Sequence, residues 1–231
     1  MTRHTALAVI AITGDTFETC RRSTIPANPG LVAWAHLYAQ CGQAVAPIRS
    51  GPISRLAGHH ALYQREMLLR HGQNLESLMA NEALLHEDLR ITGTEMYVLG
   101  DVAIPQVQIS RLRTFIRHEF MSQRIYGAAR ASVFRWSLAR RLLYVAGSPP
   151  IPILRVSRSI SDIRRTGRGR TLLPQIIPVM LLGTLSGAVG EALGYLMGAR
   201  SRDVAGRFEI ELDRYAFVNR ADSSSPKAPR L

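Results

Sequence analysis

The part of this sequence that most restricts its fold is residues 171–190, a run of twenty residues without a charged side chain. As an α-helix, such a run is about 30 Å long, which matches the hydrocarbon core of a lipid bilayer. Pro174, Gln175 and Pro178 weaken the apolar pattern at its start. A helix of this kind must be covered by lipid or by protein, and we expect a membrane-associated or transmembrane segment over residues 171–197.

Glycines recur at four-residue spacing in this segment, in two short series. They are Gly183, Gly187, Gly190, Gly194 and Gly198. Small residues at this spacing share one helix face and let a second helix come close in lipid. The spacing favours helix–helix self-association, and chance spacing in a glycine-rich apolar helix is the alternative.

The positive charge of the chain is concentrated just before this segment. The formal net charge is +12, and residues 111–170 contain fourteen Arg and two acidic residues, Glu119 and Asp162. Arg residues beside an apolar helix are typical of the cytoplasmic face of the cell membrane, where anionic membrane lipids are the partner. Nucleic acid is not favoured as a partner, because apolar runs interrupt the Arg residues and no nucleic-acid-binding module is recognisable.

Upstream of the basic region, the sequence predicts a strand that leads into two helices. Residues 58–63 form an extended run that begins with a Gly, and residues 64–72 form a helix that ends in another Gly. The second helix begins at Asn81, a good N-cap residue, and ends at Gly93. Its buried stripe consists of Leu84, Leu85 and Leu89.

Glu82 occupies the first turn of this second predicted helix. The free N–H groups and peptide dipoles of a first turn favour a charged carboxylate, which is the form that a general base needs. An acidic residue at this position also supports the helix without taking part in any chemistry. The residues alone leave both interpretations open.

Several segments resemble motifs of the family 2 glycosyltransferases, an inverting class with a GT-A-type fold that is often membrane-bound. GHHALYQREML resembles the strand-to-helix segment G-x-N-x-x-Y-R-R-E-x-L, with His60 at the usual Asn and Gln64 at the first Arg. NEALLHEDLRITG resembles E-D-x-x-L-x-x-R-L-x-x-x-G, and EMYVLGDVAI resembles the strand pair that follows it. GEALGYLMG resembles a C-terminal membrane-proximal segment of the family, so that the likeness extends over about residues 9–218.

The resemblance implies an α/β fold, with a partial GT-A-like mixed sheet and flanking helices, followed by a mainly α membrane-associated C-terminal region. The acceptor-side half of the α/β domain would occupy residues 1–108. Arg-rich helices and the membrane-associated segment would occupy residues 109–200. A tail would follow over residues 201–231, and its Ser- and Pro-rich end is expected to be disordered from about residue 221.

The resemblance also assigns roles to residues of this chain. Counting back from Gly93 places Glu82 at the acidic position that serves as the catalytic general base. The acceptor side would be lined by His59, His60, Tyr63 and Arg65. The candidates for contact with a diphosphate are Arg124 and Arg130. The partners of a complete enzyme would be a nucleotide-sugar donor and a glycan or lipid acceptor.

The family's Asp-x-Asp motif, which holds the metal and the donor diphosphate, does not occur in the sequence. We therefore expect a truncated form, a donor site on a separate polypeptide, or a fold kept for another purpose, in that order. No cofactor is expected within this chain, and Mn²⁺ or Mg²⁺ is expected only with the donor half. No metal site is expected, because adjacent residues such as His59 and His60 face opposite sides of a strand.

Other segments complete the expected organisation. A buried strand is expected at residues 7–12, and a helix at residues 31–40 with Trp34 in the core. Residues 109–141 read as one long helix or two joined ones. Residues 142–154 read as interfacial, re-entrant or buried, and residues 208–218 as a last strand or a short amphipathic segment. The alternative function is that of a non-catalytic, Arg-rich membrane-associated protein.

Overall fold

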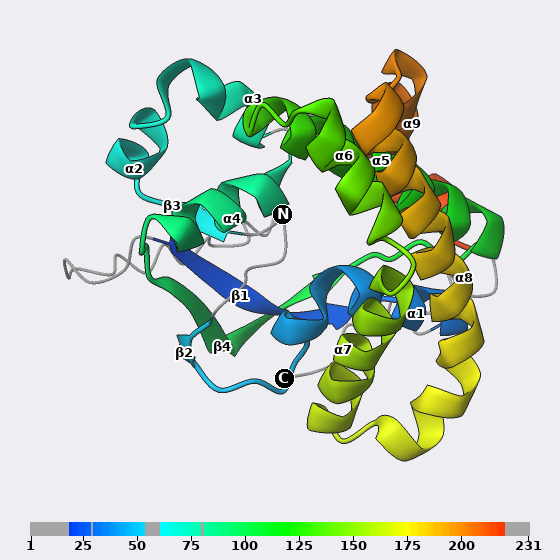
Figure 1. Ribbon diagram of the computed structural model, residues 1–231. Coiled ribbons are helices and arrows are strands. Elements are labelled where there is room, and N and C mark those ends of the chain that lie inside the picture. Colours follow the sequence, from blue (N-terminus) through cyan, green and yellow to red (C-terminus); the bar gives the residue numbers. More distant parts are fainter. Residues whose placement is uncertain (1–18, 29, 54–60, 80, 220–231) are drawn as a thin grey trace.

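A computed structural model describes residues 19–28, 30–53, 61–79 and 81–219 of the chain. The expected strand at residues 7–12 and the expected disorder from residue 221 lie outside the described residues. The described part combines a small sheet with many helices, and most of the helices lie to one side of the sheet (Figure 1).

The sheet is mixed and has the strand order β2-β4-β1-β3. β1 (Thr19–Pro26) runs parallel to β4 (Met96–Gln106) and antiparallel to β3 (Ala61–Tyr63), while β2 (Gly51–Pro52) runs antiparallel to β4. A mixed sheet with flanking helices was expected from the sequence, and this coarse prediction is confirmed. The strand pair expected at residues 95–104 is instead one strand, because β4 pairs with the whole length of β1, with a single irregularity.

The helices of the N-terminal half are short. They are α1 (Leu31–Cys41), α2 (Arg65–Leu69), α3 (Leu75–Met79) and α4 (Glu82–Ile91). α1 and α4 confirm the helices predicted there. The helix predicted at residues 64–72 ends earlier, because Gly72 adopts a left-handed conformation with a φ of 52° and starts a short 3₁₀ turn, η2 (Gly72–Asn74). Gly93 has a φ of 81° and follows the end of α4, as predicted.

The C-terminal half is helical. Its helices are α5 (Leu112–Val133), α6 (Leu138–Ala146), α7 (Ile151–Arg165), α8 (Gly169–Met197) and α9 (Ser201–Leu212). Residues 109–141 were expected to form one long helix or two joined helices, and the structure has two. The first helix ends at Val133, and Arg135 in the connection has a positive φ of 48°. The strand reading of residues 208–218 is wrong, because α9 and the 3₁₀ helix η3 (Arg214–Phe217) cover this segment.

α8 is the helix expected from the apolar run, and by length and composition it could span a membrane. In the structure it lies beside α5, in the most extensive contact between two elements (Figure 1). Gly190 and Gly194 face the backbone of α5, at Phe120 and Arg124. The glycine face of α8 is therefore covered within the chain, and self-association through it would require α5 to move away.

The two halves of the chain share a hydrophobic core. Leu37 and Tyr38 of α1 pack with Ile163 of α7 and with Ile176 and Met180 of α8. Trp34 packs against the edge of the same cluster, in line with the core role expected for it. α1 is thereby fixed against the basic helices α7 and α8. The buried side of α4 packs against α5 through Tyr126, Ala129 and Val133.

Candidate functional site

The predicted general base, Glu82, is the first residue of α4. Asn81 precedes it as the N-cap residue and is buried, and the Leu84 N–H donates to the Asn81 carbonyl oxygen at 2.8 Å. The Glu82 side chain is half-buried. The carboxylate thus belongs to the first helical turn, where unpaired N–H groups and the helix dipole stabilise negative charge.

Apolar packing fixes the position of α4. Leu84, Leu85 and Leu89 are almost fully buried, and they pack with Met67 of α2 and Leu78 of α3. Leu85 and Leu89 are four residues apart and Leu84 adjoins Leu85, so the three side chains lie on one side of the helix. The predicted buried stripe is confirmed, and it holds the N-terminal turn of α4 in a defined orientation.

Tyr63, an expected acceptor-side residue, lies at the end of β3 and contacts α4. Its hydroxyl group and Nε2 of His86 are 2.7 Å apart, and the two rings stack with centroids 5.8 Å apart. His86 follows Glu82 by four residues, so both residues lie on the same side of α4. The structure therefore adds His86 to the candidate site. The four-residue spacing from Glu82 was the signal in the sequence that could have identified it.

The other expected acceptor-side residues are less defined. Arg65 is the first residue of α2, and its side chain is exposed. His59 and His60 lie outside the described residues. Of the acceptor-side group, the structure thus connects Tyr63 with α4 through His86, and it places Arg65 two residues after Tyr63 on the surface.

Arg130, a candidate for diphosphate contact, is engaged inside the protein. Its Nη2 donates to Oε1 of Glu87 in α4 at 2.7 Å, and its guanidinium carbon lies 5.2 Å from the ring centroid of Trp136 and 5.4 Å from that of Tyr144. Tyr126 donates to the other Glu87 oxygen at 3.2 Å, and burial raises the pKa of its phenol well above 10. These contacts join α4 to α5, and Arg130 could meet a diphosphate only after losing them.

Arg124, the other candidate, is also engaged and is only 3% exposed. Its Nε donates to the Gly198 carbonyl oxygen at 2.9 Å, and its Nη1 lies 3.3 Å from Oδ2 of Asp203. The same carboxylate accepts from the Arg200 N–H at 3.2 Å, at the start of α9. Arg124 thus connects α5 with the end of α8 and the start of α9.

We expect Arg124→Leu to lower the free energy of unfolding by about 3 kcal/mol, because it leaves the Asp203 carboxylate buried without its counter-charge. The matched control is Arg113→Leu, an exposed Arg of α5, which should change stability by about 0.5 kcal/mol or less. Urea denaturation followed by circular dichroism measures both. Unchanged stability combined with weaker diphosphate binding would instead favour the ligand-binding role.

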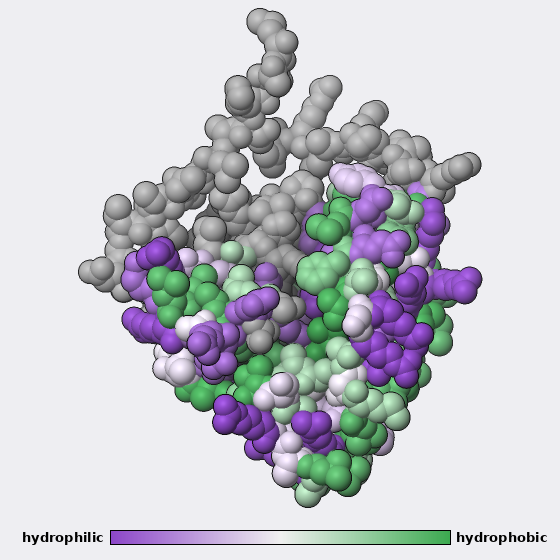
Figure 2. Space-filling model, turned by 90° about the horizontal axis from the view of Figure 1, so that it is seen from above, coloured by the Kyte–Doolittle hydropathy of each residue, from purple (hydrophilic) through white to green (hydrophobic). Residues whose placement is uncertain are grey.

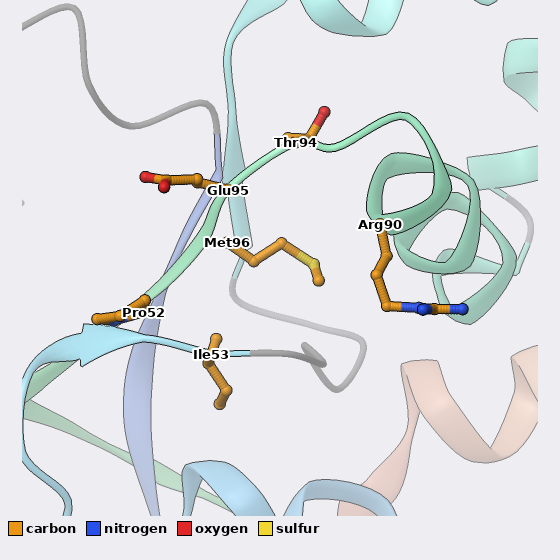
Figure 3. A pocket seen from close by; sticks show the side chains of 6 residues that line it. All are labelled: Pro52, Ile53, Arg90, Thr94, Glu95 and Met96. Carbon is orange, nitrogen blue, oxygen red and sulfur yellow. The ribbon is translucent and has the colours of Figure 1, made fainter.

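A shallow pocket of about 300 Å³ lies at the opposite end of α4 (Figure 3). Its lining residues are Pro52, Ile53, Arg90, Thr94, Glu95 and Met96. The side chain of Glu95 points away from those of Met96 and Arg90, so the polar groups do not converge on one point (Figure 3). Arg90 is eight residues from Glu82, or about 12 Å along the helix axis. This pocket therefore does not contain the predicted base.

One cluster of buried side chains has the composition of a metal site. His36 of α1 and His118 and Glu119 of α5 each offer one ligand atom, and these atoms lie within 4.8 Å of one another. All three residues are at most 4% exposed. Burial lowers the pKa of His36 well below its usual value of 6.5, and the nearby His118 and Arg214 add to this effect. No metal site was expected from the sequence, and these residues were not identified, because His36 is far in sequence from the adjacent His118 and Glu119.

Comparisons with protein-family models, with curated proteins and with solved structures find no match to this chain.

Proposed function

We propose that this chain is the acceptor-side part of an inverting, membrane-associated glycosyltransferase of the family 2 type, with Glu82 as its general base. The observation that carries the proposal is the order of elements around Glu82. The segments that resemble the family's motifs coincide with β3 and α2, with α4, and with β4, and Glu82 begins α4. The mixed sheet and the Tyr63–His86 contact beside α4 support the same assignment.

In this proposal the reaction is a single displacement at the anomeric carbon of a nucleotide sugar. The Glu82 carboxylate accepts the proton of the acceptor hydroxyl group while the hydroxyl oxygen attacks the anomeric carbon. A new carbon–oxygen bond forms, the bond to the nucleoside diphosphate breaks, and the configuration at the anomeric carbon inverts. Tyr63 and His86 would orient the acceptor side of α4.

The Mn²⁺ or Mg²⁺ of such enzymes does not fit residues of this chain, because the sequence has no Asp-x-Asp pair. The donor diphosphate and its metal would be bound by another polypeptide or by a longer form of this one. The proposal therefore assigns to this chain the acceptor side and the base, and no step of donor binding.

Calorimetry with nucleotide sugars and Mn²⁺ or Mg²⁺ tests the proposal directly. The detergent-solubilised chain is compared with a polypeptide extended upstream, where one is encoded, and with the chain mixed with a candidate donor-binding partner. We expect binding and sugar transfer with the extended or complemented protein. Binding by the chain alone would contradict the assignment of the donor site, and no binding in any form would contradict the enzyme assignment.

A second observation favours a position at the membrane surface. Apolar side chains that are between 51% and 69% exposed follow one another on α6 and α7, and we call this group the apolar face. It consists of Leu138, Leu142, Leu143, Ile153 and Leu154. Hydrophobic and hydrophilic areas also alternate on the face of the molecule seen from above (Figure 2). Amphipathic helices with Arg on the polar side are typical of helices that lie in the headgroup region of an anionic bilayer.

We propose that α6, α7 and the exposed side of α8 rest in the interface of the cytoplasmic leaflet, so that α8 does not cross the bilayer. The opposite side of α8 carries the buried Glu191, whose Oε2 lies 2.6 Å from Nη2 of Arg155. α5, which covers this side, contains the buried Glu119 and Arg124. A transmembrane α8 would carry these charged groups into the hydrocarbon or lose its contact with α5, and either change costs free energy.

The double variant Leu143→Glu/Ile153→Glu should reduce binding to anionic vesicles by about 100-fold or more. Each aliphatic side chain contributes about 1.5–3 kcal/mol when it moves from water into the bilayer. Vesicle flotation measures the partition between membrane and buffer. The control is Leu69→Glu, which changes an exposed leucine of α2 away from the apolar face. Equal partitioning of the double variant, the control and the wild type would contradict the proposed face.

A further inference from the structure

The geometry of the buried cluster of His36, His118 and Glu119 points to a structural site for a divalent transition metal ion, with Zn²⁺ as the ion that fits it best. This inference is independent of the proposed glycosyltransferase function. The site lies between α1 and α5, away from the start of α4.

His36 has a defined orientation at this cluster. Its Nδ1 lies 2.6 Å from Oε1 of Gln108. With the Gln108 amide oxygen on this side, Nδ1 carries the proton and the lone pair of the ring is on Nε2, while the buried Gln108 amide nitrogen has no hydrogen-bond partner among the described residues. Nε2 of His36 is buried, and among the described residues no group forms a hydrogen bond with it. A buried imidazole lone pair without a donor costs free energy, and a metal ion would satisfy it.

His118 also has one ring nitrogen near oxygen atoms. Its Nε2 lies 3.6 Å from Oε1 of Glu211 and 3.5 Å from Oγ of Ser122. With the proton on Nε2, the Ser122 oxygen can accept it, the Glu211 carboxylate lies just beyond hydrogen-bond distance, and the lone pair is on Nδ1. A carboxylate that accepts from the second nitrogen of a histidine commonly orients a metal-binding imidazole, and Glu211 could do so after a small shift. Nε2 of His36 thus has no hydrogen-bond partner among the described residues, whereas Nδ1 of His118 has the Gln40 amide nitrogen as its neighbour at 3.5 Å.

The Gln40 side-chain amide lies beside two of the three proposed ligands. Its Nε2 lies 3.2 Å from Oε1 of Glu119 and 3.5 Å from Nδ1 of His118. The amide N–H group, a donor with partial positive charge, therefore lies between two of the three proposed ligands. A cation there would have the same two neighbours. A flip of the amide would offer its oxygen as a fourth ligand, since the two orientations of an amide have nearly the same shape.

The ligand set decides which metal is expected. Two imidazole nitrogens and one carboxylate oxygen suit Zn²⁺, Fe²⁺, Co²⁺ or Ni²⁺, whereas Mg²⁺ and Mn²⁺ prefer oxygen ligands. The ligand atoms lie within 4.8 Å of one another. On one tetrahedral Zn²⁺ they would be about 3.3 Å apart. The side chains must close slightly on the ion, which would fasten α1 to α5 at the centre of the protein.

Metal analysis of the purified full chain, carrying a tag without histidines, tests the inference. After removal of metal by a chelator and titration with Zn²⁺ or Co²⁺, we expect one equivalent per chain, visible d–d absorption of the Co²⁺ form, and no competition from millimolar Mg²⁺. Saturation with Zn²⁺ at about 100 times its Kd should raise the Tm by about 5–10 °C. Absence of stoichiometric binding by the wild type would overturn the inference.

Variants locate the site. His36→Gln and Glu119→Gln should lose the bound equivalent, while His71→Gln, a half-buried histidine of another part of the surface, should keep it. Should the ligand variants fail to fold, X-ray absorption of the wild-type Zn²⁺ form decides instead. Two imidazole ligands and no sulfur are expected there, and sulfur ligation or fewer than two imidazoles would overturn the assignment.

Discussion

The double variant Gly190→Ala/Gly194→Ala is expected to lose about 6 kcal/mol of folding free energy and to show no cooperative unfolding transition. A Cβ atom at either position would come closer than 3.0 Å to the carbonyl oxygen of Phe120 or Arg124 in α5. A backbone oxygen cannot rotate away as a side chain can, so α5 and α8 must separate. Overpacking of this kind costs up to about 3 kcal/mol per site, and the sum approaches the stability of many domains.

The control for this prediction is Gly187→Ala in the same helix. Its Cβ would meet Cγ of Gln123 at 3.0 Å and Nη1 of Arg155 at 3.4 Å, both on flexible side chains. Ala also favours the helix over Gly by about 1 kcal/mol, so we expect stability within about 1 kcal/mol of the wild type. Urea denaturation followed by circular dichroism compares the variants. A double variant as stable as Gly187→Ala would show that α5 and α8 do not pack as described.

These glycines also show what the sequence could and could not predict. Their spacing predicts that another helix comes close to α8, and the structure places α5 there. The spacing alone does not identify that helix, because it describes only the surface of α8. α5 lies about 60 residues upstream, and its facing side combines Phe120 and Gln123 with Gly127, where an added Cβ would meet the backbone of Glu191 in α8. Nothing local in the sequence pairs this glycine with those of α8.

The candidate site likewise has some features that the sequence could predict and others that it could not. The start of α4 after Asn81 and its buried leucines were predictable, since helix-start residues and helical periodicity are local signals, although the Asn81 side chain forms no capping hydrogen bond. The engagement of Arg124 and Arg130 was not, because it depends on which carboxylates and rings the fold brings near them. The cluster of His36 and His118 is the strongest case, because its members share no local pattern.

Glu82→Gln is expected to lower kcat for sugar transfer by about 10²–10⁴-fold in a preparation in which the donor site is supplied. Gln has nearly the shape of Glu and still forms hydrogen bonds, but its amide does not accept the proton of the acceptor hydroxyl group. We therefore expect KM for the acceptor to change little. Steady-state transfer assays at varied acceptor concentration separate the two constants.

The stability of the same variant distinguishes catalysis from support of the helix. Loss of the negative charge at the start of α4 should cost about 0.3–1 kcal/mol, whatever the chemical role of Glu82. Glu76→Gln is the matched control, since Glu76 lies in the first turn of α3 and is exposed, and it should lose a similar amount without loss of rate. Equal transfer rates for the two variants would reduce Glu82 to a helix-start residue. A loss of rate at Glu82 alone, with both variants equally stable, requires a carboxylate that acts on the substrate.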